Sequence, residues 1–225
     1  MLKPKERFAV ARSRVLVCER AGQGTAVPVG RLTCSHVAAP GLASSMLGEV
    51  VSIHQLTAPC FTQMLEALSA QLDKGAALAE AKGFDATVLM NARLAPDMQP
   101  LASQIRFACA QAAEARTRLT GRNVVEPPSV ETLDAAKSLI AETITLLAAS
   151  KSTELDAAAE RSIELSLPNG MTFDMNGFDH VRNWAIPQFY FHIVAAYVIL
   201  RHNGVGLGKA DYVRHMFAHL RSQSL

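Results

Sequence analysis

The segment 186–204, IPQFYFHIVAAYVILRHNG, limits the fold of this chain more than any other stretch. Between residues 189 and 200 it is apolar on almost every side, and His192 is its one strongly polar side chain. A helix that is apolar all round belongs at the centre of a protein, with other helices covering it. The window 184–200 is about as long as the shortest membrane spans, but it contains Pro187 and His192. We therefore expect a buried helix and no membrane span.

Helical periodicity also marks the first half of the chain. Apolar residues recur at spacings of three to five over residues 50–81, which predicts a long amphipathic helix. Pro59 lies inside this segment and predicts a separate first piece or a kink. Gly83 predicts the end of the helix, and Asp85 predicts the cap of a short helix that ends at Asn91.

Two further helices follow. Pro96 suits the first turn of a helix and Asp97 suits its positive end, so we expect the second long helix to open there and to end at Gly121. The Pro pair at 127–128 breaks the chain. Ser129 then predicts the cap of a third helix.

Residues 161–175 change from the helical period to a period of two on both sides of an Asn-Gly turn, which predicts a β-hairpin. The last long helix is expected to begin near Phe178, to bend at Pro187 and to end at residues 203–204. Together these segments predict an all-α fold, an antiparallel four-helix bundle with a small hairpin (about 161–175) before the last bundle helix.

Residues 1–45 differ from the rest of the chain. They are rich in Gly, Ala, Ser and Pro without a sustained period. Two interpretations remain: an extension without stable structure, or a translation start placed too far upstream, with Met46 as the first residue. We therefore divide the chain into residues 1–45, a helical bundle over 46–212 and a C-terminal tail over 213–225.

Composition narrows the classes of function. Apolar residues make up 49% of the 225 residues and charged residues 19%, which is enough apolar side chain for a large core. The formal net charge of +2 is too small to indicate nucleic-acid binding. The four cysteines show no metal-type spacing and indicate free thiols, so we expect a cytoplasmic protein.

His192 is the leading candidate for a functional residue, because a buried imidazole needs hydrogen-bond partners. A core histidine bonded to a neighbouring group is the simpler interpretation. A metal held on one helix would need a second ligand one turn away, where the chain has Gln188 and Ala196. His202 lies about 15 Å farther along the helix and belongs to the helix end, so it cannot share an ion with His192.

Other polar residues could accompany His192. Asp97 and Gln104 would share one face of the second long helix and could form a polar cluster with His192. The spacing of Arg93 and Asp97 permits a salt bridge at the same corner. His54 could approach from the first helix, although nothing in the sequence fixes its direction.

Two local patterns carry no functional assignment. His215 and His219 have the i,i+4 spacing of metal ligands but lie on a basic terminal segment, which favours a solvated helix face. The Gly-rich segment GVGLGKAD at 204–211 follows a helix rather than linking a strand to a helix. It is therefore not a phosphate-binding loop.

Three stretches together resemble the bacterial family catalogued as domain of unknown function 1993, a branch of the DinB/YfiT-like four-helix-bundle superfamily. They are QMLEALSAQLDKGAALAEAKG at 63–83, ARLAPDMQPLASQIRFA at 92–108 and IPQFYFHIVAAYVILRHNGVGLGKADY at 186–212. The resemblance covers about residues 50–212. It implies a DinB-like bundle, and many members of the superfamily form homodimers.

The wider superfamily typically holds a divalent metal with three histidines, one from the second helix and two from near the last bundle helix. Some members transfer thiols. Here the second helix carries no histidine and has Gln104 in that region, and only His192 has a counterpart in the last helix. The resemblance therefore implies a DinB-like protein that binds a small molecule without this metal site or another cofactor. The candidate pocket residues are His192, Asp97, Gln104, His54 and Tyr197. The alternative is a thiol-transferase type of enzyme that uses zinc or nickel at an altered site around His192.

Overall fold

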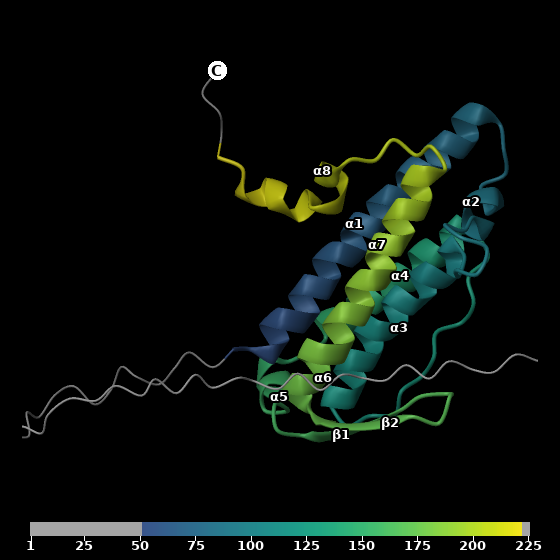
Figure 1. Ribbon diagram of the computed structural model, residues 1–225. Coiled ribbons are helices and arrows are strands. Elements are labelled where there is room, and N and C mark those ends of the chain that lie inside the picture. The colour runs from purple at the N-terminus through teal and green to yellow at the C-terminus, as the bar shows by residue number, and fades with distance from the viewer. Residues whose placement is uncertain (1–50, 222–225) are drawn as a thin grey trace, which may run out of the picture. The chain divides into compact units, whose positions relative to one another are not determined.

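The structure is a computed structural model that describes residues 51–221, a helical bundle with one small sheet (Figure 1). The predictions for residues 1–45 and for Met46 lie outside these residues and stay predictions. The elements are α1 (Ile53–Lys82), α2 (Thr87–Asn91), α3 (Leu101–Leu119), α4 (Leu133–Ala148), α5 (Ser152–Asp156), β1 (Ser162–Ser166), β2 (Thr172–Asn176), α6 (Gly177–His180), the π-helical turn η1 (Val181–Ala185), α7 (Ile186–His202), α8 (Lys209–Tyr212) and the 3-10 helix η2 (Arg214–His219).

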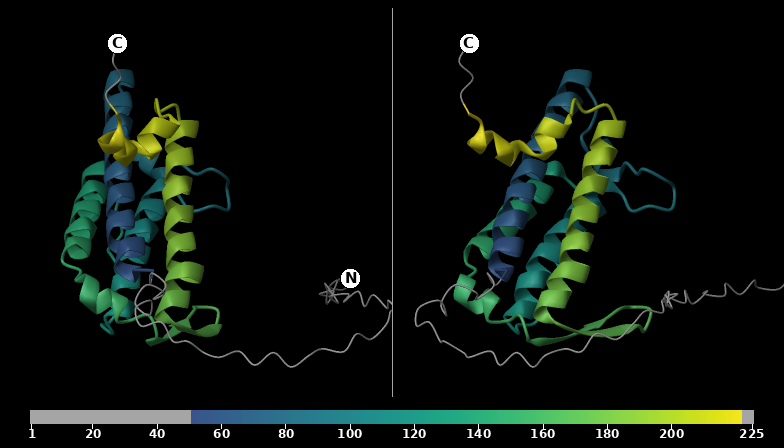
Figure 2. Two further views of the ribbon diagram at one scale, coloured as in Figure 1. Left: turned by 90° about the vertical axis from the view of Figure 1, so that its left-hand side faces the viewer. Right: turned by 60° about the vertical axis from the view of Figure 1, so that its left-hand side comes forward.

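Four long helices, α1, α3, α4 and α7, form the bundle. α7 packs mainly on α3, and α1 packs on α4 and α7. The pairs α1/α4 and α3/α7 are antiparallel, whereas α3 and α4 run in the same direction (Figures 1 and 2). Residues 120–132 connect α3 to α4 and cross the length of the bundle. The predicted all-α bundle with a hairpin is confirmed, with one long crossover connection of the kind known in other four-helix bundles.

The long helix α1 is continuous through Pro59. Ser52 caps it by accepting a hydrogen bond from the N–H of Gln55 (3.1 Å). Because Pro59 has no N–H, the carbonyl of Gln55 loses its usual donor, and the Cys60 thiol donates to it instead (3.2 Å). The prediction of a separate first piece is therefore wrong. Gly83 ends the helix with φ at 68°, as predicted.

Two helix starts differ from the prediction. The segment around Pro96 and Asp97 is a turn, and α3 begins only at Leu101. The predicted cap Ser129 lies before α4, whose cap is Thr132; its hydroxyl accepts a hydrogen bond from a main-chain N–H of the first turn (3.1 Å). In both cases a residue suited to a helix start belongs to the connection that precedes the helix.

The predicted hairpin is confirmed. β1 and β2 pair antiparallel, with Leu165 opposite Phe173, and Ile163 and Leu165 point into the protein. Gly170 in the connecting turn has φ at 85°, a backbone conformation that few other residues adopt. The strands run along the lower end of the bundle, and the turn of the hairpin extends beyond the helices (Figures 1 and 2).

The last bundle helix begins with α6, at the position predicted, and passes through η1 into α7. In η1 the N–H of Ile186 donates to the carbonyl of Val181, five residues back, so the helix is locally wider. Pro187 follows directly, in the first turn of α7, where its missing N–H is tolerated. The helix ends at Asn203, and Gly204 has φ at 90°.

The expectation that the last helix is covered on all sides is wrong. One face of α7 packs on α1 and α3, where Phe189 stacks on Phe61 with ring centroids 4.3 Å apart. The opposite face is open: Phe191 is 57% exposed and Val194 is 43% exposed. None of the helices among residues 51–221 is long and apolar enough to cross a membrane.

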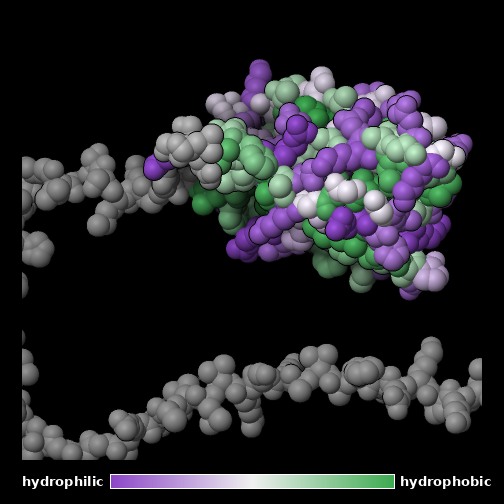
Figure 3. Space-filling model, turned by 90° about the horizontal axis from the view of Figure 1, so that it is seen from above, coloured by the Kyte–Doolittle hydropathy of each residue, from purple (hydrophilic) through white to green (hydrophobic). Residues whose placement is uncertain are grey.

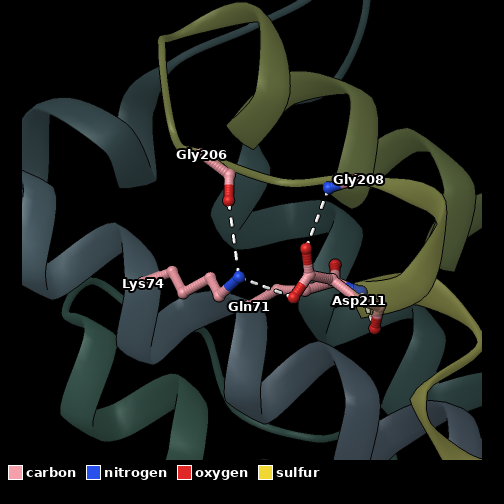
Figure 4. Close-up of polar contacts among 5 residues, drawn as sticks. All are labelled: Gln71, Lys74, Gly206, Gly208 and Asp211. Carbon is pink, nitrogen blue, oxygen red and sulfur yellow. Dashed lines mark hydrogen bonds and ion pairs between the residues drawn. The ribbon is translucent and has the colours of Figure 1, made fainter. Parts of the chain in front are cut away.

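The Gly-rich segment after α7 docks the C-terminal part of the chain on α1 (Figure 4). Lys74 donates to the carboxylate of Asp211 (2.6 Å) and to the carbonyl of Gly206 (3.4 Å). The N–H of Gly208 donates to the other oxygen of the same carboxylate (2.8 Å), and the Gln71 amide donates to the carbonyl of Asp211 (3.4 Å). This Gly-rich segment therefore has a structural role in docking, in place of the phosphate binding that its glycines alone would suggest.

Candidate functional site

His192 and Gln104 form a polar pair between α7 and α3. The Nδ1 atom of His192 lies 2.8 Å from Oε1 of Gln104, which is only 2% exposed. The Nε2 group of Gln104 donates to the carbonyl of Gln99 (3.2 Å). That contact fixes which end of the amide is the oxygen, so Nδ1 of His192 carries the proton and Nε2 is left as an acceptor.

Burial keeps the His192 imidazole neutral. Desolvation lowers the pKa of His192 from 6.5 to about 4. Two aromatic rings flank the imidazole: Phe107 of α3, with ring centroids 5.2 Å apart, and Phe191, at 5.3 Å. The structure thus supports the simpler interpretation of a bonded histidine, with one nitrogen still free to accept a hydrogen bond.

The residues around His192 do not fit the three-histidine metal site of the superfamily. Gln188 and Ala196 occupy the positions one turn away, and the one polar side chain that faces His192 from α3 is an amide. Over residues 51–221, no three His, Cys, Asp or Glu side chains come close enough to hold a metal ion.

Asp97 does not join the predicted cluster. It is exposed in the turn before α3, and in the described part of the chain it bonds neither Gln104 nor His192. The predicted salt bridge to Arg93 is also not formed, because the Arg93 guanidinium donates to the carbonyl of Met98 (2.7 Å). The prediction failed because it placed Asp97 inside the helix.

His54 and Tyr197 also lie apart from the pair. His54 is in the first turn of α1, where its main-chain N–H donates to the carboxylate of Asp156 in α5 (2.9 Å). That is the end of the bundle where α3 finishes, about 20 Å along α3 from Gln104. Tyr197 faces Tyr212 of α8, with ring centroids 5.9 Å apart. Of the five predicted pocket residues, the structure brings together only His192 and Gln104.

A hollow of about 410 Å³ lies next to this pair, between α3, the segment 124–126, the hairpin and η1. Phe107 joins the two features, since it lines the hollow and also packs on His192. Ala110, Leu165 and other apolar side chains form most of the wall. The size is within the range of pockets that hold small ligands.

Trp184 lines this hollow, and its indole N–H is buried beside it. The indole is held by η1 and packs near Phe173 of the hairpin, with ring centroids 6.3 Å apart. Its Nε1 group is buried and has no hydrogen-bond partner among residues 51–221. A buried N–H without a partner costs about 1–3 kcal/mol, and a ligand in the hollow would reach it only if the indole turned.

Two arginines of α3 line the hollow, and they differ in how tightly their present partners hold them. Arg118 is fully engaged: its Nε donates to Glu114 (2.6 Å) and its Nη1 donates to the carbonyl of Glu164 (2.8 Å). Arg106 has only a loose ion pair with Glu126, whose side chain is 87% exposed, at 3.7 Å. Arg106 is therefore the cation of this hollow that is held less tightly by its present partner.

A second buried histidine lies at the α6/η1 junction. His180 is fully buried, and neither ring nitrogen has a partner within the described residues. Burial, with the nearby charge of Arg118 as a smaller cause, lowers the pKa of His180 to about 4. No pocket opens to it among those described here, so it is a feature of the core rather than of the ligand hollow.

A second hollow, of about 470 Å³, lies between α1 and the docked C-terminal segment. Three of its charged groups already serve other contacts, since Lys74 and Asp211 bond each other and Asp73 pairs with Lys137 of α4. The 3-10 helix η2, which follows α8, carries the exposed apolar side chains of Met216 and Phe217. It is visible as a green region beside the grey atoms in Figure 3. The first hollow, with its apolar side chains and loosely paired arginine, is the better candidate for a binding site.

Sequence reasoning missed Trp184, Arg106 and Phe107. A signal was present, because Trp184 is the only tryptophan and precedes Pro187 by one helical turn. Periodicity does not predict a π-helical turn, however, and it is η1 that directs the indole toward the hairpin.

Comparison with known proteins agrees with this geometry. The model of the family described as Domain of unknown function (DUF1993) matches residues 53–213. A crystal structure of a DinB family member protein from Shewanella denitrificans is similar, with 39% sequence identity, a TM-score of 0.65 and coverage of 71% of this chain and 90% of that chain. No curated protein matches the chain. The chain belongs to the DUF1993 family and has the DinB-like bundle fold.

Proposed function

We propose that this protein binds a small molecule in the hollow between α3 and the hairpin, beside the His192–Gln104 pair. The observation that carries the proposal is the hollow of about 410 Å³ beside the pair, lined by Phe107 and Trp184, with the loosely paired Arg106 in its wall. Ligand pockets combine mostly apolar walls with a few polar groups that fix orientation. This hollow combines eight apolar side chains with six polar or charged ones, so it is more polar than a typical ligand pocket.

His192 has a supporting role in this proposal. Its bond to Gln104 holds the imidazole in one orientation, and Phe107 packs between the imidazole and the hollow. A neutral imidazole at pH 7 can accept a hydrogen bond at Nε2 but carries no charge. We therefore assign ligand binding without the three-histidine metal, and we assign no chemical step to these residues.

Binding can be followed through the single tryptophan. A fluorescent apolar probe bound in the hollow would receive excitation energy from Trp184, so its sensitised emission reports the location as well as the binding. We expect saturation at about one probe per chain, within the capacity of a hollow of this size. Ala110→Phe fills the hollow and should abolish the signal. Ala148→Phe, at an exposed position of α4, is the matched control.

Elemental analysis tests the metal-dependent alternative. Protein purified without a polyhistidine tag should hold no stoichiometric zinc or nickel. Stoichiometric metal that disappears in a folded His192→Ala variant would overturn this part of the proposal and support a thiol-transferase type of enzyme with an altered site.

We further propose a homodimer and a cytoplasmic location. A second copy of the chain is the partner assigned to the open face of α7, where exposed Phe191 and Val194 adjoin an apolar hollow lined by Leu94 and Met98. An apolar ridge beside an apolar hollow suits a two-fold interface, because the ridge of each copy can fill the hollow of the other. Sedimentation of Phe191→Glu should then show a monomer. Cys60 and Cys109 are free thiols, which favours a reducing compartment.

A further inference from the structure

We infer that the hollow takes an amphipathic organic anion, whose acid group replaces the side chain of Glu126 on Arg106. This inference rests on the proposed function and adds the chemical class of the ligand. The acid group would be a carboxylate or a sulfonate. The apolar body of the ligand would lie along Phe107 and Val125.

Arg106 is prepared for an anion. Its guanidinium lies over the Phe107 ring, 4.5 Å from the ring centroid, and its side chain is only 22% exposed. The aromatic face holds the planar cation in place without using its N–H groups. An acid group that binds here gains charge-assisted hydrogen bonds in a partly desolvated setting, where they are stronger than at the surface.

Glu126 occupies the position of that acid group only weakly. The pair is 3.7 Å long and its carboxylate is almost wholly in solvent, so its contribution is at the low end for surface ion pairs. The pair of Glu114 and Arg118 in the same wall is 2.6 Å long, with side chains 16% and 21% exposed. The contrast identifies Arg106, and not Arg118, as the group that can exchange partners.

The segment that carries Glu126 also offers apolar surface to the ligand. Residues 122–131 form neither helix nor strand, and Val124 and Val125 are 41% and 80% exposed although both line the hollow. The apolar body of a bound molecule would cover these side chains. A purely polar anion, such as inorganic phosphate, would leave them in water.

The anion class can be separated from binding as such with two probes of nearly equal shape. Anilinonaphthalenesulfonate carries a negative charge, and N-phenylnaphthylamine is its neutral counterpart. Both are titrated into the full chain, and emission sensitised by Trp184 is recorded. We expect the anionic probe to bind about tenfold more tightly, the ratio that one charge-assisted interaction provides.

Removing the charge of Arg106 and removing the charge of Glu126 should change the affinity for the anionic probe in opposite directions. Arg106→Gln should weaken the anionic probe about tenfold and change the neutral probe less than about twofold, whereas Arg106→Lys should keep part of the preference. Glu126→Gln should strengthen the anionic probe about threefold, because it removes the internal competitor. Arg201→Gln and Glu131→Gln, at exposed positions, are the controls for these charge changes. Phe191→Ser is a further control, because it removes an apolar side chain to which the probes could bind on the open face of α7.

Each outcome is decisive. Loss of the preference in Arg106→Gln together with the gain in Glu126→Gln supports the anion. Equal affinity for both probes, unchanged in Arg106→Gln but abolished in Ala110→Phe, overturns the anion class and leaves the proposed function standing. If neither probe receives energy from Trp184, both the anion class and the proposed function fail.

Discussion

His180 and His192 lie on the same helical stretch and have the same lowered pKa, but their surroundings differ. His192 shares its Nδ1 proton with Gln104 and borders the hollow through Phe107. His180 is more deeply buried and has no partner in the described chain. The comparison teaches that two histidines lowered alike in pKa by burial can differ in hydrogen bonding and in access to a hollow, so burial alone does not indicate a site.

The largest effect is expected from Gly177→Ala, at the His180 end of this stretch. A Cβ atom there would lie 2.0 Å from the carbonyl oxygen of Ala158, a main-chain atom that cannot move aside alone. We expect a loss of about 3 kcal/mol or more in the free energy of unfolding, measured with urea. Gly75→Ala is the matched control, because its nearest neighbours would be 3.5 Å away; it should gain up to about 1 kcal/mol. Equal effects of the two changes would contradict the tight packing at Gly177.

The next effect is the dependence of stability on pH. The pKa of both histidines is about 4 in the folded chain and 6.5 ordinarily, so between these values the unfolded chain binds more protons. Stability is therefore full above pH 6.5 and falls as the pH drops toward 4, by about 2–3 kcal/mol for His180. Urea unfolding at several pH values checks this. His180→Leu should flatten the curve in that window, and an unchanged slope would sink the assignment.

A smaller loss is expected from Gln104→Leu. The Nδ1 proton of His192 loses its acceptor and the carbonyl of Gln99 loses its donor, while the volume changes little. We expect the free energy of unfolding at pH 7 to fall by about 1–2 kcal/mol. Thermal and urea unfolding provide the measurement. No loss at all would mean that the pair does not hold the imidazole.

The smallest effect should come from His180→Leu at pH 7. No hydrogen bond within residues 51–221 is lost, and a buried polar group is replaced by an apolar one of similar size. The free energy of unfolding should stay within about 1 kcal/mol of the original value or rise. A loss larger than that of Gln104→Leu would reverse the comparison, and would point to a partner for His180 that the described residues do not show.

Much of the fold could be predicted from local patterns. Periodicity and the glycine at position 83 placed the first helix, and the Asn-Gly turn placed the hairpin. The start of α3 was missed because Pro96 and Asp97 suit a helix start and a turn equally well, and packing decided between them. The open face of α7 was missed for a related reason, since apolar residues on all sides do not show which sides are covered.

The candidate site was predictable only in part. The pairing of His192 with Gln104 follows from two helices that each carry one polar group in an apolar face. The hollow depends on long-range placement: the crossover 120–132 brings Glu126 to Arg106, and η1 turns Trp184 toward the hairpin. Neither feature has a period or a motif from which it could be read.

Energy transfer from Trp184 to a bound amphipathic probe tests the central claim most directly. The account predicts sensitised emission that saturates at about one probe per chain in protein free of zinc and nickel, and that is absent in Ala110→Phe and unchanged in Ala148→Phe. Probe binding without energy transfer from Trp184, or transfer that persists in folded Ala110→Phe, would contradict it.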